Sequence, residues 1–159
     1  MTYHTFVESP VGPLLLLSNG QALTGLYMNY LQVPEGSVAD ETAAPLPLVK
    51  AQLAEYFAGA RTEFDLPLSP TGTAFQLRIW KLLGEIPYGV TISYGELARR
   101  AQDPNASRAV GLANGKNPIS IIIPCHRVIG ANGKLTGYGG GLPNKKILLD
   151  LEAGRDSLF

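Results

Sequence analysis

The sequence predicts an α/β domain over residues 1–72, followed by a mainly α domain over residues 73–159 that contains a helix-turn-helix. Short strand-like segments dominate the first part, and apolar residues at helical spacing dominate the second. A segment with Pro and Gly at residues 69–72 separates the two parts, as linkers commonly do. The two parts therefore differ in composition as well as in periodicity.

Charge supports the same division. The chain of 159 residues has a formal net charge of zero, yet residues 1–72 hold two basic and seven acidic side chains. Residues 73–159 hold eleven basic and six acidic ones. Halves of opposite sign indicate an acidic module joined to a basic module that faces an anion. Chance clustering on two solvated faces stays open as the alternative.

Composition excludes several classes of protein. With 45% hydrophobic residues, a chain of this length buries enough surface for a packed core and is not a disordered tail. Its apolar runs are too short to span a membrane, and its first residues lack a signal-peptide layout, so we expect a cytoplasmic protein. One Cys and two His exclude an intramolecular disulfide and a standard zinc site, so we expect no metal and no cofactor.

The first module is expected to contain strands and one helix. Alternating or apolar segments bounded by turn residues predict three strands, at residues 3–8, 14–18 and 23–28. The Asn19-Gly20 pair is typical of a hairpin between the second and third strands. A helix is expected between Pro45 and Gly59, because Val49, Leu53, Tyr56 and Phe57 recur at helical spacing. Residues 61–68 are expected to add a strand, and residues 29–44 show no clear period.

The second module opens with a helix and continues with a helix pair. Thr73 is a suitable N-cap for an apolar stripe of Phe75, Ile79, Leu82 and Leu83. Residues 93–96 (Ser-Tyr-Gly-Glu) fit a capping box that opens a short helix ending near Ala101. Residues 103–105 break the pattern, and a further helix is expected over residues 106–114. Two short helices joined by a tight turn in a basic stretch resemble a helix-turn-helix, although ordinary helical hairpins share the pattern.

The single cysteine, Cys125, follows an apolar stretch at residues 119–123 that reads as a buried strand ended by Pro124. A lone Cys in such a place usually packs in the core. His126 and Arg127 follow directly, however, and a cation or base lowers the pKa of a thiol or removes its proton. On a regular strand the side chains of Cys125 and His126 would point apart, so contact requires irregular backbone or a bridging water.

Residues 123–128 (Ile-Pro-Cys-His-Arg-Val) resemble the active-site signature of the O6-alkylguanine-DNA alkyltransferases. Further segments agree, namely residues 86–89 with 93–94, 108–111, 136–140 and 148–152, and more weakly residues 9–14. The resemblance implies an N-terminal ribonuclease-H-like α/β domain and a mainly α C-terminal domain with a winged-helix-like helix-turn-helix. It also implies a partner, double-stranded DNA that contains O6-alkylguanine, with the protein monomeric when off DNA.

The activity that the resemblance implies is DNA repair by a single, irreversible transfer of the alkyl group to Cys125. O4-alkylthymine is a further candidate substrate. His126 would take the thiol proton through a water, Glu152 would orient and stabilise the imidazolium, and Asn117 would hydrogen-bond within this network. The thioether product has no carbonyl for water to attack, so each chain would act once.

The resemblance also implies residues that flip the base and residues that line the pocket, because an alkylated guanine must leave the stack to react. Arg108 would fill the gap left by the flipped nucleotide, and Tyr94, with Ser93 beside it, would crowd the adjacent phosphate. Tyr138 would cover the guanine, and the Gly139 N–H would lie near the leaving oxygen. The remaining pocket positions are Val128, whose carbonyl would accept from the exocyclic amine, and the wall residues Ser120 and Thr136.

Two other classes remain open at this stage. A non-catalytic helix-turn-helix protein that binds DNA or senses damage would explain the basic half, but it leaves Cys125, His126 and Tyr138 without a role. A cysteine hydrolase would use Cys125 and His126, but it would turn over repeatedly and ignore DNA.

Overall fold

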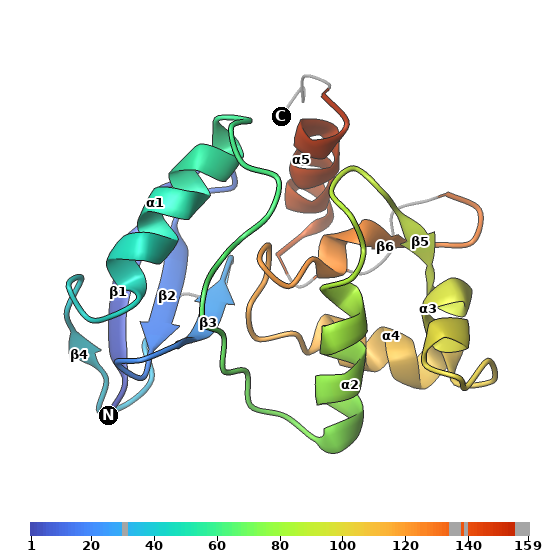
Figure 1. Cartoon of the computed structure of the whole chain (residues 1–159), viewed down its shortest axis with the longest axis horizontal. Helices are drawn as coiled ribbons and strands as arrows, with labels where there is room; N and C mark the ends of the chain where they lie inside the picture. The colour runs from blue at the N-terminus through green and yellow to red at the C-terminus, as the bar shows by residue number, and fades with distance from the viewer. Residues whose placement is uncertain (30–31, 134–137, 139, 155–159) are drawn as a thin grey trace. The chain divides into compact units, whose positions relative to one another are not determined.

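The computed structural model describes residues 1–29, 32–133, 138 and 140–154. The chain divides into two compact units, Met1–Thr71 and Gly72–Phe159, and each is described by itself (Figure 1). None of the helices in the described part of the chain is long and apolar enough to cross a membrane.

The first unit is built on a four-stranded sheet with the strand order β3-β2-β1-β4. The strands are β1 (Tyr3–Val7), β2 (Leu14–Ser18), β3 (Leu23–Tyr27) and β4 (Val38–Ala39). β2 pairs antiparallel with both β1 and β3, and β4 pairs parallel with β1. Every residue of β2 is buried, which accounts for its four consecutive leucines, because a strand covered on both faces carries apolar residues throughout. The three predicted strands are confirmed, and the two-residue β4 was not predicted.

Helix α1 (Leu46–Phe57) contacts β2 (Figure 1). The predicted inward stripe is confirmed for Val49, Leu53 and Tyr56, which are buried. Phe57 is half-buried and stacks edge-on against Tyr56.

The expected strand at residues 61–68 is wrong. Only a single bridge, between Leu23 and Leu68, joins this segment to the sheet. The buried side chain of Gln52 takes the place of a strand partner. Its Nε2 donates to the carbonyl of Asp65 at 3.0 Å, and its Oε1 accepts from the Asp65 N–H at 2.9 Å. A side-chain amide thus satisfies backbone groups that a ladder would otherwise pair.

The described residues of the second unit form four α-helices, one 3₁₀-helix and two short strands. They are α2 (Ala74–Leu83), β5 (Ile92–Ser93), α3 (Tyr94–Arg100), α4 (Ser107–Gly115), η1 (Cys125–Arg127), β6 (Val128–Ile129) and α5 (Leu142–Glu152). Thr73 caps α2 in a full capping box with Gln76, as a Ser/Thr followed by Gln allows. The indole N–H of Trp80 donates to the carbonyl of Ala113 at 2.8 Å and ties α2 to α4.

Helices α3 and α4 pack against each other and against α2, which confirms the helix-turn-helix. Ser93 accepts from the Glu96 N–H at 3.0 Å, but the Glu96 carboxylate does not complete the expected box. It pairs with Arg99 and Arg100 instead, and these two partners lower the pKa of Glu96. Two of the basic side chains of this unit therefore share the single negative charge of a neighbouring carboxylate.

The buried strand expected at residues 119–123 is also wrong, although Ile119, Ile121 and Ile123 are buried. Residues 120–122 form turns, and Ile121 has φ of 71°, a value that β-branched residues rarely adopt. The side chain of Asn117 holds this turn. Its Oδ1 accepts from the Ile119 N–H at 3.0 Å, and its Nδ2 donates to the Ile123 carbonyl at 2.7 Å. A side chain that bonds two backbone groups competes with strand pairing.

Candidate active site

Cys125 is the first residue of the 3₁₀-helix η1, directly after Pro124. The turn held by Asn117 leads into this helix, and the Cys125 N–H donates to the Ile123 carbonyl at 2.8 Å. The irregular backbone that contact between adjacent Cys and His side chains would require is therefore present. Cys125 is 5% exposed, so the thiol lies inside the unit.

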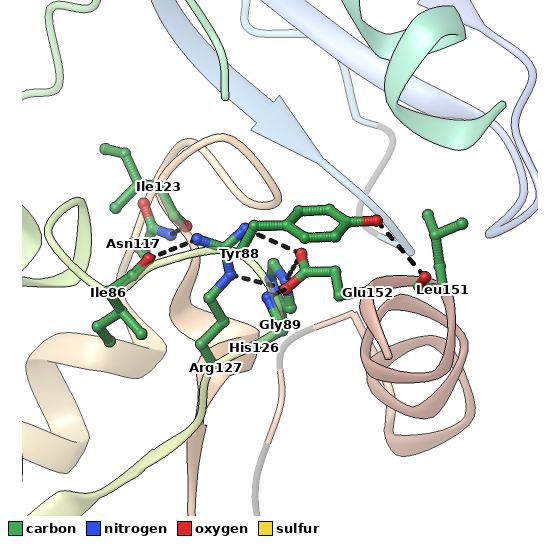
Figure 2. Close-up of polar contacts among 9 residues, drawn as sticks. All are labelled: Ile86, Tyr88, Gly89, Asn117, Ile123, His126, Arg127, Leu151 and Glu152. Carbon is green, nitrogen blue, oxygen red and sulfur yellow. Dashed lines mark hydrogen bonds and ion pairs between the residues drawn. The ribbon is translucent and has the colours of Figure 1, made fainter. Parts of the chain in front are cut away.

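His126 and Glu152 form a buried pair, shown in Figure 2. The imidazole Nε2 lies 2.7 Å from Oε2 of Glu152, which comes from the last turn of α5. An ionised carboxylate only accepts hydrogen bonds, so Nε2 carries the proton and Nδ1 is the basic nitrogen. No side chain or backbone group of the described residues hydrogen-bonds Nδ1, which leaves it able to accept a proton.

Burial keeps His126 neutral. The loss of solvent lowers the pKa of its imidazole, more than the hydrogen bond and the charge of Glu152 raise it, and the charges of Arg127 and Lys145 lower it further. A histidine held neutral in this way is prepared to act as a base.

The Glu152 carboxylate is also bound by Arg127. The guanidinium donates from Nε to Oε1 at 2.8 Å and from a terminal nitrogen to Oε2 at 3.0 Å, and the Gly89 N–H reaches Oε1 at 3.3 Å. Figure 2 shows the guanidinium between Glu152 and the Ile86 carbonyl, to which it donates at 2.6 Å.

The Cys125 thiol is protonated at neutral pH. Burial raises its pKa, and a hydrogen bond from Asn117 and the charge of Lys145 partly oppose that shift. Nucleophilic attack by such a thiol requires a base, because the thiolate is the nucleophile. The sequence suggested the adjacent Arg127 as the cation that acts on the thiol, but that cation is Lys145.

Sequence reasoning missed Lys145, whose charge acts on the Cys125 thiol. Its side chain is fully buried, and Nζ donates to the Val128 carbonyl at 2.7 Å and lies 5.9 Å from the centre of the Tyr138 ring. Burial lowers the pKa of Lys145, and Cys125 raises it. A signal was present in the sequence, since Lys145, Leu148 and Glu152 follow helical spacing and so share one face of α5.

The structure places the other expected residues in two groups. Both Asn117 and Val128 are buried; Asn117 hydrogen-bonds the thiol, and the Val128 carbonyl accepts from Lys145. Ser93 and Tyr94 lie at the start of α3, both half-buried, and Arg108 is exposed in the first turn of α4. Tyr138 and Ser120 are half-buried, whereas Thr136 and Gly139 lie outside the described residues.

The Tyr94 ring faces α4, because a Cβ built on Gly111 would come within 3.7 Å of it. Beside Arg108, the outer surface of α4 presents Ala109 and Leu112, the latter 65% exposed. This surface carries few charges and small or apolar side chains.

A helix-turn-helix joined to a buried thiol and a His–Glu pair combines a nucleic-acid-binding motif with a nucleophilic site. Family models match both units of the chain. The family model described as 6-O-methylguanine DNA methyltransferase, ribonuclease-like domain, matches residues 2–70, and the DNA binding domain of the same family matches residues 74–154. The chain belongs to the 6-O-methylguanine DNA methyltransferase family.

Individual relatives are similar in sequence to nearly the whole chain. Proteins named methylated-DNA–protein-cysteine methyltransferase are 54% identical in Mycobacterium tuberculosis (157 residues, 98% of this chain and 94% of the relative) and 50% identical in Methanosarcina acetivorans (156 residues, 94% and 97%). The crystal structure of Mycobacterium tuberculosis OGT in complex with DNA is 51% identical, with a TM-score of 0.91 and coverage of 98% of this chain and 96% of that one.

Proposed function

We propose that this protein repairs DNA by transferring the alkyl group of O6-alkylguanine to its own Cys125, once per chain. The observation that carries the proposal is the buried thiol of Cys125 in the same unit as the buried His126–Glu152 pair at 2.7 Å. Relatives named methylated-DNA–protein-cysteine methyltransferase, about half identical over nearly the full length, support this reading of the site.

The reaction follows from the protonation states of the site. Nδ1 of His126 accepts the thiol proton through a bridging water, and Glu152 stabilises the imidazolium that forms. The thiolate sulfur then attacks the alkyl carbon in line with the C–O6 bond. As the S–C bond forms, the C–O6 bond breaks and its electron pair stays on the guanine. The guanine anion takes up a proton and becomes ordinary guanine, the imidazolium of His126 returns its proton to solvent, and the thioether is not hydrolysed.

Lys145 and Asn117 also act on the thiol. The Lys145 ammonium stabilises negative charge on sulfur, and Asn117 holds the turn before Cys125 and hydrogen-bonds the thiol. In the pocket, Tyr138 covers the guanine and Ser120 forms part of the wall, whereas the expected roles of Gly139, as a donor to the leaving oxygen, and of Thr136, as a wall residue, concern positions outside the described residues. Such donors stabilise the charge that develops on the base as the alkyl carbon leaves.

Helices α3 and α4 supply the DNA-binding surface. Arg108 on α4 fills the gap in the stack, while Ser93 and Tyr94 at the start of α3 contact the displaced phosphate. The small and apolar outer surface of α4, with Ala109 and Leu112, suits a groove with few sequence-specific contacts. We expect the protein to act on double-stranded DNA in the cytoplasm and to be monomeric when off DNA.

The test is the intact mass of the protein after incubation with a duplex that contains one O6-methylguanine. The expected result is one added methyl group per chain, located on Cys125 by peptide mapping and absent in Cys125→Ala. Repeated turnover would instead indicate a hydrolase. An unchanged mass in folded protein that binds the duplex would indicate a damage sensor, and either outcome would contradict the proposal.

A second variant separates base flipping from chemistry. Arg108→Ala is expected to slow methyl transfer from the duplex but to leave transfer from the free alkylated base unchanged, because the free base needs no flipping. An equal loss with both substrates would place Arg108 in the chemical step and contradict its assignment to flipping.

A further inference from the structure

Arg127 is buried although it carries a permanent charge. Its side chain is 8% exposed, and it donates to both oxygens of Glu152 and to the Ile86 carbonyl at 2.6–3.0 Å. The guanidinium carbon also lies 5.8 Å from the centre of the Tyr88 ring. A buried ion pair costs desolvation energy, so its presence alone says little about stability. A bidentate pair of this kind does fix the position of the carboxylate.

The same carboxylate is the partner of His126. Oε2 accepts from both His126 Nε2 and Arg127, and Oε1 accepts from Arg127 and the Gly89 N–H. Glu152 therefore has no freedom to rotate away from the imidazole without breaking a bidentate contact. Two cations also share one negative charge whenever His126 is protonated, which disfavours the imidazolium.

We propose that Arg127 is a positioning residue for alkyl transfer: by holding both oxygens of Glu152, it keeps the His126 imidazole in the tautomer whose Nδ1 accepts the thiol proton, and it sets the pH above which transfer proceeds. This inference rests on the function proposed above. The direction of the effect on His126 agrees with it, since the charge of Arg127 lowers the pKa of that imidazole.

Among the residues that the structure describes, few other groups near His126 would produce a pH effect. Lys145 and Glu152 act on it from α5, and Tyr88 faces Glu152 and Arg127 from the turn before β5. Helix α2 also packs against η1, but its buried side chains are apolar, and its charged residues Arg78 and Lys81 are exposed.

The test is the single-turnover rate of methyl transfer to Cys125 as a function of pH. In Arg127→Gln we expect the acidic limb of the profile to move to higher pH by about half a unit or more, because a cation that opposes protonation of His126 is lost. The plateau rate is expected to fall roughly tenfold or more, since the base loses its fixed position. A lower plateau with an unmoved limb, or a limb moved to lower pH, would overturn the proposal.

Arg127→Lys separates the charge from the bidentate contact. It retains the positive charge but cannot hold two oxygens in a planar fork, so the limb should stay in place while the plateau falls. A full rate in this variant would overturn the positioning role. Arg61→Gln is the matched control, because Arg61 pairs with Glu55 at 3.1 Å on the surface of the first unit, and its profile should be unchanged.

A measurement on the unmodified protein keeps the proposal testable if the variants do not fold. Nitrogen-15 NMR of the His126 ring at neutral pH should show a protonated Nε2 and an unprotonated Nδ1. The opposite tautomer would overturn the proposal whether or not methyl transfer is observed. If the unmodified protein shows this tautomer but transfers no methyl group, the proposed function fails while the positioning of His126 stands.

Discussion

Replacing Glu152 with Gln should destabilise the second unit strongly, because the carboxylate is the counter-charge of the buried Arg127 guanidinium and also binds the buried His126 imidazole. The Glu152 side chain is 1% exposed and accepts from His126 at 2.7 Å, from Arg127 at 2.8 and 3.0 Å, and from the Gly89 N–H at 3.3 Å. A neutral amide leaves the guanidinium buried without a counter-charge, and its own N–H groups face donors. Removal of one partner of a buried pair costs about 3–5 kcal/mol, a large share of the roughly 5–15 kcal/mol that holds a typical domain.

Urea unfolding followed by tryptophan fluorescence measures this loss. Trp80 is the only tryptophan, it is 3% exposed, and it belongs to α2, so its emission reports on the second unit. Lys146→Gln is the control on the same helix, because its pair with Asp150 is partly exposed and such pairs contribute under about 1 kcal/mol. A loss of less than about 1 kcal/mol for Glu152→Gln would refute the view that this carboxylate balances buried charge.

Three further outcomes are expected. Stability should fall as the pH drops below 6.5, because burial lowers the pKa of His126 below that ordinary value and the unfolded chain then binds the proton better. Urea midpoints between pH 7.5 and 5 measure this fall, and Lys146→Gln should show the same fall. Lys145→Met should raise the thiol pKa of Cys125, seen as a shift to higher pH in the rate of alkylation by iodoacetamide, and an unmoved profile would remove Lys145 from the site. Gln52→Leu should lower the free energy of unfolding of the first unit by about 1–3 kcal/mol, because two backbone groups of Asp65 lose their partners. Unfolding followed by circular dichroism measures the loss, and an unchanged free energy would contradict this account of residues 61–68.

Local features of the fold were predictable wherever neighbouring residues decide them. The Thr73 cap is confirmed because a hydroxyl accepts from a backbone N–H three residues on, within one turn of helix. The strands were found where turn residues bound short apolar runs, as at Asn19-Gly20. The same reasoning wrongly predicted a strand at residues 119–123. The apolar run correctly indicates burial but not a strand, because the nearby Asn117 side chain bonds the backbone into a turn.

The site was predictable only in part. Cys125 and His126 were found because they are adjacent and belong to a specific motif, and Glu152 was found through the resemblance to a family. Lys145 and the pairing of Arg127 with Glu152 were missed, because they depend on how α5 packs against η1.

The sequence by itself determined the two-unit organisation, the helix-turn-helix, the burial of the isoleucines around residue 121 and the identity of the nucleophile. These follow from periodicity, capping and a local motif, which act over a few residues. Only the tertiary structure decided which cation acts on the Cys125 thiol, which nitrogen of His126 faces Glu152 and what holds Glu152. Those answers depend on charges brought together from segments some 25 residues apart, such as Arg127 and Glu152, and on the loss of solvent that strengthens their interaction.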